Sequence, residues 1–279
     1  MKSVRAVLVL ACAVAPLAWA DTGAEVRKKA ESLLSSGDVD GAIQEFREAL
    51  KLEPKNSRDH FELGLALRRK GQMTDAISEY REAIRLEPKL AEAHANIGSI
   101  LQAQGDYTQA ITEYREAIRI QPNLAVAHAN LGAALRITRK LDDAILELRT
   151  ALRLDPDIAE AHRDLGFSLA LKRDMDGAIP ELREAIRLDP NMIEAHMGLG
   201  NALQAKGKVD EAIVEYREGV RLNPRDANTH KDLASALFRK GEKAEAEKEM
   251  DEAVKLDPSL ARRVPSPMDK PAPPVGPGQ

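Results

Sequence analysis

Cysteine and aromatic residues are scarce in this sequence. The single cysteine of the 279 residues is Cys12, close to the N-terminus. Beyond the first twenty residues the chain therefore has no thiol for a disulfide, a thiolate metal site or a cysteine nucleophile. Aromatic residues make up only 3% of the chain, whereas alanine, leucine, glutamate and arginine abound, and these side chains lose little rotamer freedom in a helix. The composition predicts an all-α protein.

Acidic residues are missing from the first twenty residues, which carry Lys2 and Arg5 before an apolar run to Leu17. The tripeptide Ala18-Trp19-Ala20 follows as a small-x-small sequence. This pattern is typical of a secretory signal peptide over residues 1–20, and the apolar run is too short to span a bilayer comfortably. The sequence predicts an exported protein, either periplasmic in a Gram-negative bacterium or secreted.

Two other interpretations of this segment remain open. It could be a buried N-terminal helix, although it has no polar face to match the amphipathic segments that follow. The sequence Val9-Leu10-Ala11-Cys12 loosely resembles a bacterial lipoprotein cleavage box, which would place a lipid anchor at Cys12.

A strong charge of either sign is also absent. The formal net charge is −4, and removal of Lys2 and Arg5 leaves 39 basic against 45 acidic residues. This mildly acidic balance offers no general attraction to nucleic acid or to an anionic membrane surface. We expect a protein or peptide partner instead.

Prolines recur at a fixed interval of 34 residues. A period of this length is typical of a stacked array in which no repeat can bury its apolar face alone. Seven repeats fill residues 23–260, and a proline-rich tail at 261–279 is expected to be disordered or extended,. The prolines are Pro54, Pro88, Pro122, Pro156, Pro190, Pro224 and Pro258, and the repeats are 23–56, 57–90, 91–124, 125–158, 159–192, 193–226 and 227–260.

Each repeat is expected to form two helices. In repeat three the first helix is predicted over 91–104 and the second over 106–121, with Gly105 as the stop between them,. Small residues recur where helices must approach closely, opposite bulky residues of the second helix. Gly64, Gly98, Gly132, Gly166 and Gly200 recur in the first helices, and Ala42, Ala76, Ala110, Ala144, Ala178, Ala212 and Ala246 in the second.

These positions resemble the tetratricopeptide repeat family over residues 23–260, and the phrases AEAHANIG and YREAIRLEP are similar to repeats of O-linked N-acetylglucosamine transferase. The resemblance implies a right-handed α-solenoid of seven helix–turn–helix repeats whose first helices line a concave groove for a peptide or a partner's helix. That transferase carries an asparagine ladder at repeat position 6, which Asn96 and Asn130 match. Glu62, Asp164, Gly198 and Asp232 do not match it, and with only 19 residues after the array no catalytic domain is expected. The carboxylate clamp of co-chaperones is not reproduced at Ala95, Ser99 and Asn130 either.

Departures from the repeat pattern lie at the two ends and in the middle. Lys29 and Glu247 replace apolar residues in the terminal repeats, which predicts capped ends and a monomer,. Arg139 and Arg173 stand where other repeats have the stop glycine, and Pro180 enters a second helix. We expect kinks or looser turns there.

All six histidines occupy repeat position 4: His60, His94, His128, His162, His196 and His230. Equivalent positions in neighbouring repeats are about 10 Å apart or more at usual helix spacings, too far for a shared metal ion. No serine, threonine or cysteine recurs beside them as a nucleophile. A packing role is predicted, in which charging these partly buried rings near pH 5–6 should destabilise the array.

Neither a phosphate-binding loop nor a paired-carboxylate site is visible, so we expect no enzyme, no cofactor and no metal. Function is then expected in the groove, whose lining the family places at repeat positions 2, 5, 6, 9, 12 and 13. These positions vary between repeats, as a recognition surface would, and Asn96 stands at one of them, whose counterparts are Asn130, Asp164, Gly198 and Asp232. The candidate groove residues are Phe61, Leu65, Arg68, Arg69, Asn96, Asn130, Ala133, Arg136, Ile137, Arg163, Phe167, Leu171, Met197, Asn201, Phe238 and Arg239.

The sequence thus predicts an exported, non-enzymatic scaffold that holds an extended peptide or a helix by apolar contacts, amides and arginines. The alternative is a subunit or assembly factor of a cell-envelope complex that contacts its partners through the convex face.

Overall fold

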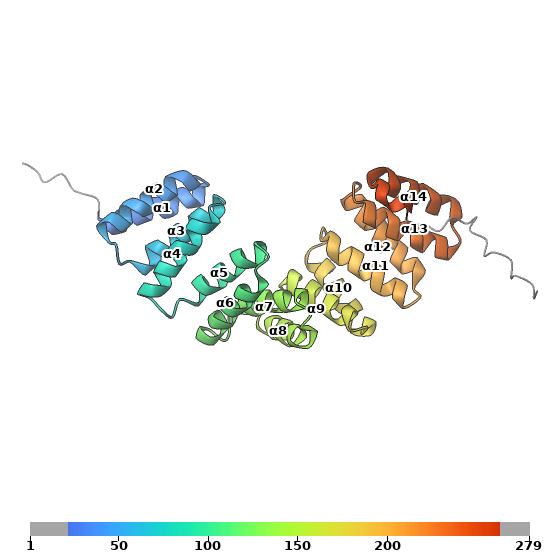
Figure 1. The fold of residues 1–279 in the computed structure, drawn as a ribbon, viewed down its shortest axis with the longest axis horizontal. Helices are drawn as coiled ribbons and strands as arrows, with labels where there is room; N and C mark the ends of the chain where they lie inside the picture. The colour runs from blue at the N-terminus through green and yellow to red at the C-terminus, as the bar shows by residue number, and fades with distance from the viewer. Residues whose placement is uncertain (1–21, 263–279) are drawn as a thin grey trace, which may run out of the picture. The chain divides into compact units, whose positions relative to one another are not determined.

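The computed structural model describes residues 22–262, which form fourteen α-helices and one short 3-10 helix, with no strand in this range (Figure 1). The predicted signal peptide, the candidate lipid anchor at Cys12 and the tail from residue 263 onward lie outside the described residues. Ala261 and Arg262, at the start of the predicted tail, close the 3-10 helix η1 (Pro258–Arg262). The fold class predicted from the sequence, an all-α array of seven helix–turn–helix repeats, is confirmed.

The first helices of the seven repeats are α1 (Gly23–Ser36), α3 (Ser57–Arg69), α5 (Ala91–Ala103), α7 (Ala125–Ile137), α9 (Ala159–Leu171), α11 (Ile193–Ala205) and α13 (Ala227–Lys240). The second helices are α2 (Val39–Leu52), α4 (Met73–Leu86), α6 (Tyr107–Ile120), α8 (Leu141–Leu154), α10 (Met175–Leu188), α12 (Val209–Leu222) and α14 (Lys243–Leu256). The helices belong to two compact units, described by residues 22–100 and 101–262.

Within each compact unit a first helix packs on the second helix of its own repeat and on that of the repeat before it. In the second unit α9 contacts α8 and α10, and it also contacts the first helices α7 and α11. This alternation buries one face of each helix against two neighbours, which no repeat could achieve alone.

Close contact inside repeats two, four, five and six depends on a glycine facing a large side chain. A Cβ atom built on Gly64 would lie 2.7 Å from the Tyr80 ring, and one built on Gly200 would lie 2.6 Å from the Tyr216 ring. In repeats four and five, leucines take the place of these tyrosines, and both are fully buried. The predicted pairing of small with bulky residues is confirmed at these positions.

The turns between paired helices keep one geometry even where glycine is absent. Gly105 has a φ of 84°, and Arg139 and Arg173 adopt the same left-handed conformation at 64° and 65°. The amide of Lys140 donates to the Leu135 carbonyl at 2.9 Å, as the amide of Asp106 does to the Leu101 carbonyl. The expected looser turns are therefore wrong: the packed neighbours hold both arginines in a conformation that costs a non-glycine residue about 1 kcal/mol.

Helix α10 also runs without interruption through Pro180, whose side chain is exposed. At the C-terminal end of the array Glu247 is exposed at the position where isoleucine is buried or half-buried in the other repeats. Helix α14 thus presents a polar outer surface, as expected of a terminal repeat. None of the described helices is long and apolar enough to cross a membrane.

Exposed lysine–aspartate pairs join consecutive repeats. A lysine at repeat position 14 pairs with an aspartate at position 18 of the preceding repeat in four places: Lys70 with Asp40, Lys172 with Asp142, Lys206 with Asp176 and Lys240 with Asp210. Such solvent-exposed pairs stabilise a fold by less than about 1 kcal/mol each.

Candidate functional site

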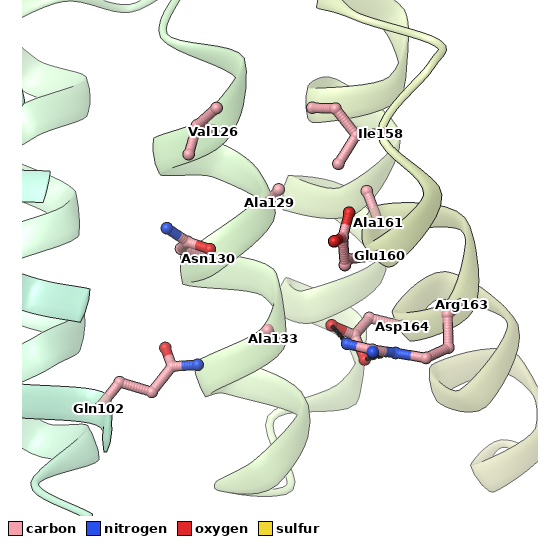
Figure 2. Close-up of a pocket in the computed structure, with 10 residues that line it drawn as sticks. All are labelled: Gln102, Val126, Ala129, Asn130, Ala133, Ile158, Glu160, Ala161, Arg163 and Asp164. Atoms are coloured by element: carbon pink, nitrogen blue, oxygen red, sulfur yellow. Dashed lines mark hydrogen bonds and ion pairs between the residues drawn. The ribbon is translucent and has the colours of Figure 1, made fainter. Parts of the chain in front are cut away.

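Three clefts lie along the first helices α7, α9 and α11 of the second compact unit. Cleft A, of about 330 Å³, opens between α7 and α9 near the end of α5 (Figure 2). Its lining residues are Gln102, Val126, Ala129, Asn130, Ala133, Ile158, Glu160, Ala161, Arg163 and Asp164. Figure 2 shows Val126 and Ile158 at the upper end of the cleft, with Gln102 and Ala133 lower down.

Cleft A combines an apolar floor with amide groups that the fold leaves available. The side chain of Asn130 makes no hydrogen bond to any residue among those described, so its donor and acceptor both remain open,. Gln102 uses its Oε1 to accept a hydrogen bond of 3.1 Å from the Tyr114 hydroxyl, which leaves its NH₂ group. Such groups can pair with the backbone of an extended peptide.

A buried carboxylate forms one wall of cleft A. Asp164 is only 3% exposed, and its oxygens lie 3.0 Å from Nη2 of Arg136 and 3.2 Å from Nη2 of Arg163. The guanidinium of Arg136 also lies over the Phe167 ring, 5.4 Å from its centroid,. Two cations thus compensate one buried charge, because an unpaired carboxylate there would be strongly unfavourable. Arg136 alone also packs on Phe167.

Clefts B and C lie on two sides of Phe167. Cleft B, of about 290 Å³, is lined by Arg136, Phe167, Ala170, Leu171, Met175, Gly198, Asn201 and Ala202. Cleft C, of about 430 Å³, is lined by Phe167, Ile193, Glu194, Met197, Gly198, Asn201, Asn223 and Asp226. The two clefts share Phe167, Gly198 and Asn201, and cleft B adjoins cleft A at the ion pair between Arg136 and Asp164.

Comparison with known sequences identifies the repeat. A profile described as "Tetratricopeptide repeat" matches residues 27–91, 130–193 and 197–261. The chain belongs to the tetratricopeptide repeat family. A "TPR repeat" profile matches residues 98–136, and a second tetratricopeptide profile matches 169–221. No curated protein matches the sequence.

Solved structures of other proteins share the fold. YrrB, described as a TPR protein with an unusual peptide-binding site, is 22% identical with a TM-score of 0.57, over 66% of this chain and 96% of its own. MamA is 27% identical with a TM-score of 0.54, over 60% of this chain and 97% of its own. PilF of Pseudomonas aeruginosa is 19% identical with a TM-score of 0.66, over 74% of this chain and 95% of its own.

The clefts of this tetratricopeptide array bring together half of the candidate groove residues. Asn130, Ala133 and Arg163 line cleft A, Arg136, Phe167, Leu171 and Asn201 line cleft B, and Met197 lines cleft C. Ile137 and Phe238 are 41% and 65% exposed, and Arg239 is exposed as well. Leu65 is half-buried in the first compact unit.

Other candidates of the first compact unit have partners within the fold. Phe61 packs against Tyr80 with ring centroids 5.6 Å apart. Arg68 donates to Oδ1 of Asn96 at 3.1 Å, and Arg69 donates to the Leu34 carbonyl at 3.3 Å. The binding role of these residues stays a prediction.

Variation at repeat position 6 has a packing cause that the sequence interpretation missed. Asn96 is bonded by Arg68, and Asp164 by Arg136, and both arginines stand at position 12 of the preceding repeat. Gly198 stands where the Phe167 ring occupies the space of a side chain. The identity at position 6 therefore depends on its neighbours, so its variation is not by itself evidence of recognition.

The candidate list lacked seven residues that also line cleft A: Gln102, Val126, Ala129, Ile158, Glu160, Ala161 and Asp164. Five of these seven stand at positions of the family's groove pattern and could have been found: Val126 and Glu160 at position 2, Ala129 at position 5, Asp164 at position 6 and Gln102 at position 12. Ala161 stands at position 3, and Ile158 belongs to the turn before α9, neither of which that pattern includes.

Gly198 offers a test of how Phe167 is held. Replacing Gly198 with alanine is expected to change the free energy of unfolding by no more than about 1 kcal/mol, because helix propensity favours alanine by a similar amount. The new Cβ must displace the outer edge of the Phe167 ring, so clefts B and C should change shape. A crystal structure of the variant and urea unfolding would measure both effects.

Gly200→Ala is the matched control, because its Cβ would press on the fully buried Tyr216 ring at 2.6 Å. That ring cannot move into a cleft, so a loss of about 1–3 kcal/mol is expected. Equal stability of the two variants would contradict this account of Phe167.

The histidines are fixed by hydrogen bonds to two acceptors. In five repeats Nδ1 lies 2.6–2.7 Å from Oε2 of a glutamate on the second helix, and Nε2 lies 3.0–3.3 Å from a proline carbonyl. The groups are His60 with Glu79 and Pro54, His128 with Glu147 and Pro122, His162 with Glu181 and Pro156, His196 with Glu215 and Pro190, and His230 with Glu249 and Pro224. No group of three metal-ligating side chains suited to an ion occurs among residues 22–262.

The expected loss of stability on charging is wrong for two of these rings. The hydrogen bond to Glu215 raises the pKa of His196 above its usual value, against the opposing effect of burial. Burial lowers the pKa of His162, but the hydrogen bonds to Glu181 and to the Pro156 carbonyl outweigh it and leave the pKa raised. The sequence could not show that each ring faces a carboxylate nineteen residues away.

Proposed function

We propose that this tetratricopeptide protein is a non-enzymatic scaffold that binds an extended segment of a partner protein along α7, α9 and α11. The observation that carries the proposal is the row of three connected clefts, lined by eight of the candidate groove residues. A peptide-binding site is described for YrrB, which shares the fold. The tetratricopeptide fold is typical of scaffolds that bind other proteins.

The chemistry of the clefts suits an extended chain. The apolar side chains of Val126 and Ile158 in cleft A, and of Leu171 in cleft B, can contact alternate side chains of the peptide,. Asn130 can pair with the peptide backbone through its open amide. In cleft B the Oδ1 of Asn201 lies 2.8 Å from the Tyr216 hydroxyl, which leaves its NH₂ group to donate to a bound peptide,.

Binding by selected peptides tests the proposal. Peptides selected from a random linear library on the full chain should lose affinity about tenfold or more when Asn130 or Phe167 is replaced with alanine, which corresponds to about 1.4 kcal/mol or more. Fluorescence polarisation would measure the affinity, and circular dichroism would show that helicity is retained.

The convex face supplies matched controls and the alternative outcome. Leu146 and Val214 are 64% and 61% exposed on the second helices α8 and α12. Replacing either with alanine should leave peptide affinity unchanged. If these variants weaken binding and the cleft variants do not, the partner uses the convex face, as a subunit of a larger complex would.

Export to the periplasm or beyond is part of the proposal and rests on the first twenty residues,.

A further inference from the structure

The imidazole rings of His162 and His196 need two hydrogens each to satisfy both of their acceptors. A proline carbonyl can only accept, so Nε2 must carry a hydrogen, and an ionised glutamate can only accept, so Nδ1 must carry one as well. Both conditions are met together only by the charged imidazolium. In His196, Nδ1 lies 2.7 Å from Oε2 of Glu215. If this ring were neutral with its hydrogen on Nε2, the lone pair of Nδ1 would point at the carboxylate oxygen.

Each such group joins three segments of the chain. His196 belongs to α11, Glu215 to α12 of the same repeat, and Pro190 to the turn that leads from α10 into α11. The same three links recur at His128, His162 and His230, so four consecutive repeats of the second compact unit carry them.

The charges that face these rings are acidic. Glu215 and Glu218 of α12 face His196, and Glu218 is bonded by Arg221. Glu181 and Glu184 of α10 face His162, and Glu184 is bonded by Arg187, which Asp157 of the preceding turn also faces. Two carboxylates beside each ring favour its protonated form.

We propose that the repeated His–Glu–Pro group is a proton-dependent brace, which ties the helix pair of each repeat to the turn before it and releases that turn when the ring loses its proton. Because the braced turns lead into α7, α9, α11 and α13, their release changes how the cleft-lining helices are held. The brace acts on the scaffold itself and does not depend on what the clefts bind.

The direction of the pH effect follows from the raised pKa values of His162 and His196. A group whose pKa is higher in the folded than in the unfolded state stabilises the fold fully below the unfolded value, about 6.5 for histidine. That contribution is lost as the pH rises through the folded value. The array should therefore be more stable at about pH 6 than at about pH 8.

A neutral analogue of the brace gives the sharpest test. Glutamine in place of the four glutamates Glu147, Glu181, Glu215 and Glu249 can donate from its NH₂ group to Nδ1, while Nε2–H still donates to the proline carbonyl. The neutral ring is then satisfied. For the full chain, the urea concentration at the unfolding midpoint of the wild type should decrease as the pH is raised from about 6 to about 8. The midpoint of the quadruple variant should not change over this range.

Equal charge removal away from the histidines is the control. Glu48→Gln, Glu87→Gln, Glu211→Gln and Glu247→Gln change four exposed glutamates, none of which bonds a histidine ring among the described residues. This variant should keep the pH dependence of the wild type. A wild type whose midpoint does not change with pH, or a brace variant that keeps the full change, would overturn the proposal.

Ring protonation can be measured on the wild type, so this test does not depend on the folding of the quadruple glutamine variant. Nitrogen-15 spectra of labelled histidine should show hydrogens on both ring nitrogens of His162 and His196 at about pH 6.5, where an ordinary ring is half neutral. Assignment uses His162→Gln and His196→Gln. Neutral rings at that pH would rule out the brace.

Discussion

Replacing Tyr216 with alanine is expected to lower the free energy of unfolding of the second compact unit by about 3–5 kcal/mol. Tyr216 is fully buried, and its ring fills the space that Gly200 leaves open. Truncation would remove this ring from the contact between α11 and α12 and leave a cavity between two helices that cannot collapse without breaking the stacking. Urea unfolding followed by circular dichroism would measure the loss.

Tyr216→Phe separates the ring from its hydroxyl group. The hydroxyl lies 2.8 Å from Oδ1 of Asn201 and 2.9 Å from Oε1 of Gln204, and its single hydrogen is shared between these two acceptors,. Burial raises the pKa of Tyr216, so the hydroxyl stays protonated. Its removal should cost about 1 kcal/mol. If alanine and phenylalanine had equal effects, packing against Gly200 would not be what stabilises this repeat.

Replacing Arg27 with methionine is expected to destabilise the first compact unit by about 3 kcal/mol. Asp59 is fully buried and accepts from Nη2 of Arg27 at 2.9 Å, while the same nitrogen donates to Glu53 at 2.9 Å. Methionine keeps most of the volume but leaves the Asp59 carboxylate without its cation. Thermal and urea unfolding of the full chain would show the loss as an earlier transition of this unit.

The double variant Arg27→Met with Asp59→Asn is the control for charge. Asparagine cannot ionise, so a substantial part of the lost stability should return although the ion pair is still absent. A double variant as unstable as Arg27→Met would show that the volume of the arginine, and not the orphaned charge, accounts for the effect.

The period of the prolines and the pairing of small with bulky residues predicted the repeats and their helices because both express contacts that every repeat makes. Local propensity failed at Arg139 and Arg173. There the neighbouring helices impose the same turn that glycine permits elsewhere, so the conformation is a property of the array and not of the residue,.

The sequence predicted several residues of the candidate site but not the ion pairs and hydrogen bonds that these residues form. Family position alone marked Asn130, Phe167 and Asn201, which the structure places in clefts. The burial of Asp164 could not be read from one repeat, because Arg136, one of its partners, belongs to the repeat before it. The histidines were recognised as structural, but their carboxylate partners, which decide the sign of the pH effect, come into reach only when the two helices pack.

The lysine–aspartate pairs divide the boundaries between repeats into two kinds, those with a pair and those without. Where Lys70, Lys172, Lys206 and Lys240 occur, the preceding repeat supplies an aspartate. At the two remaining boundaries both positions are neutral, with Thr74 before Gln104 and Thr108 before Thr138. A repeat can thus be duplicated, lost or exchanged without a mismatch only under one condition. Its residues at positions 14 and 18 must match, as a charged pair or as two neutral residues, those of its new neighbours. The order of these modules is a matter of matching edges, even though each pair adds little strength.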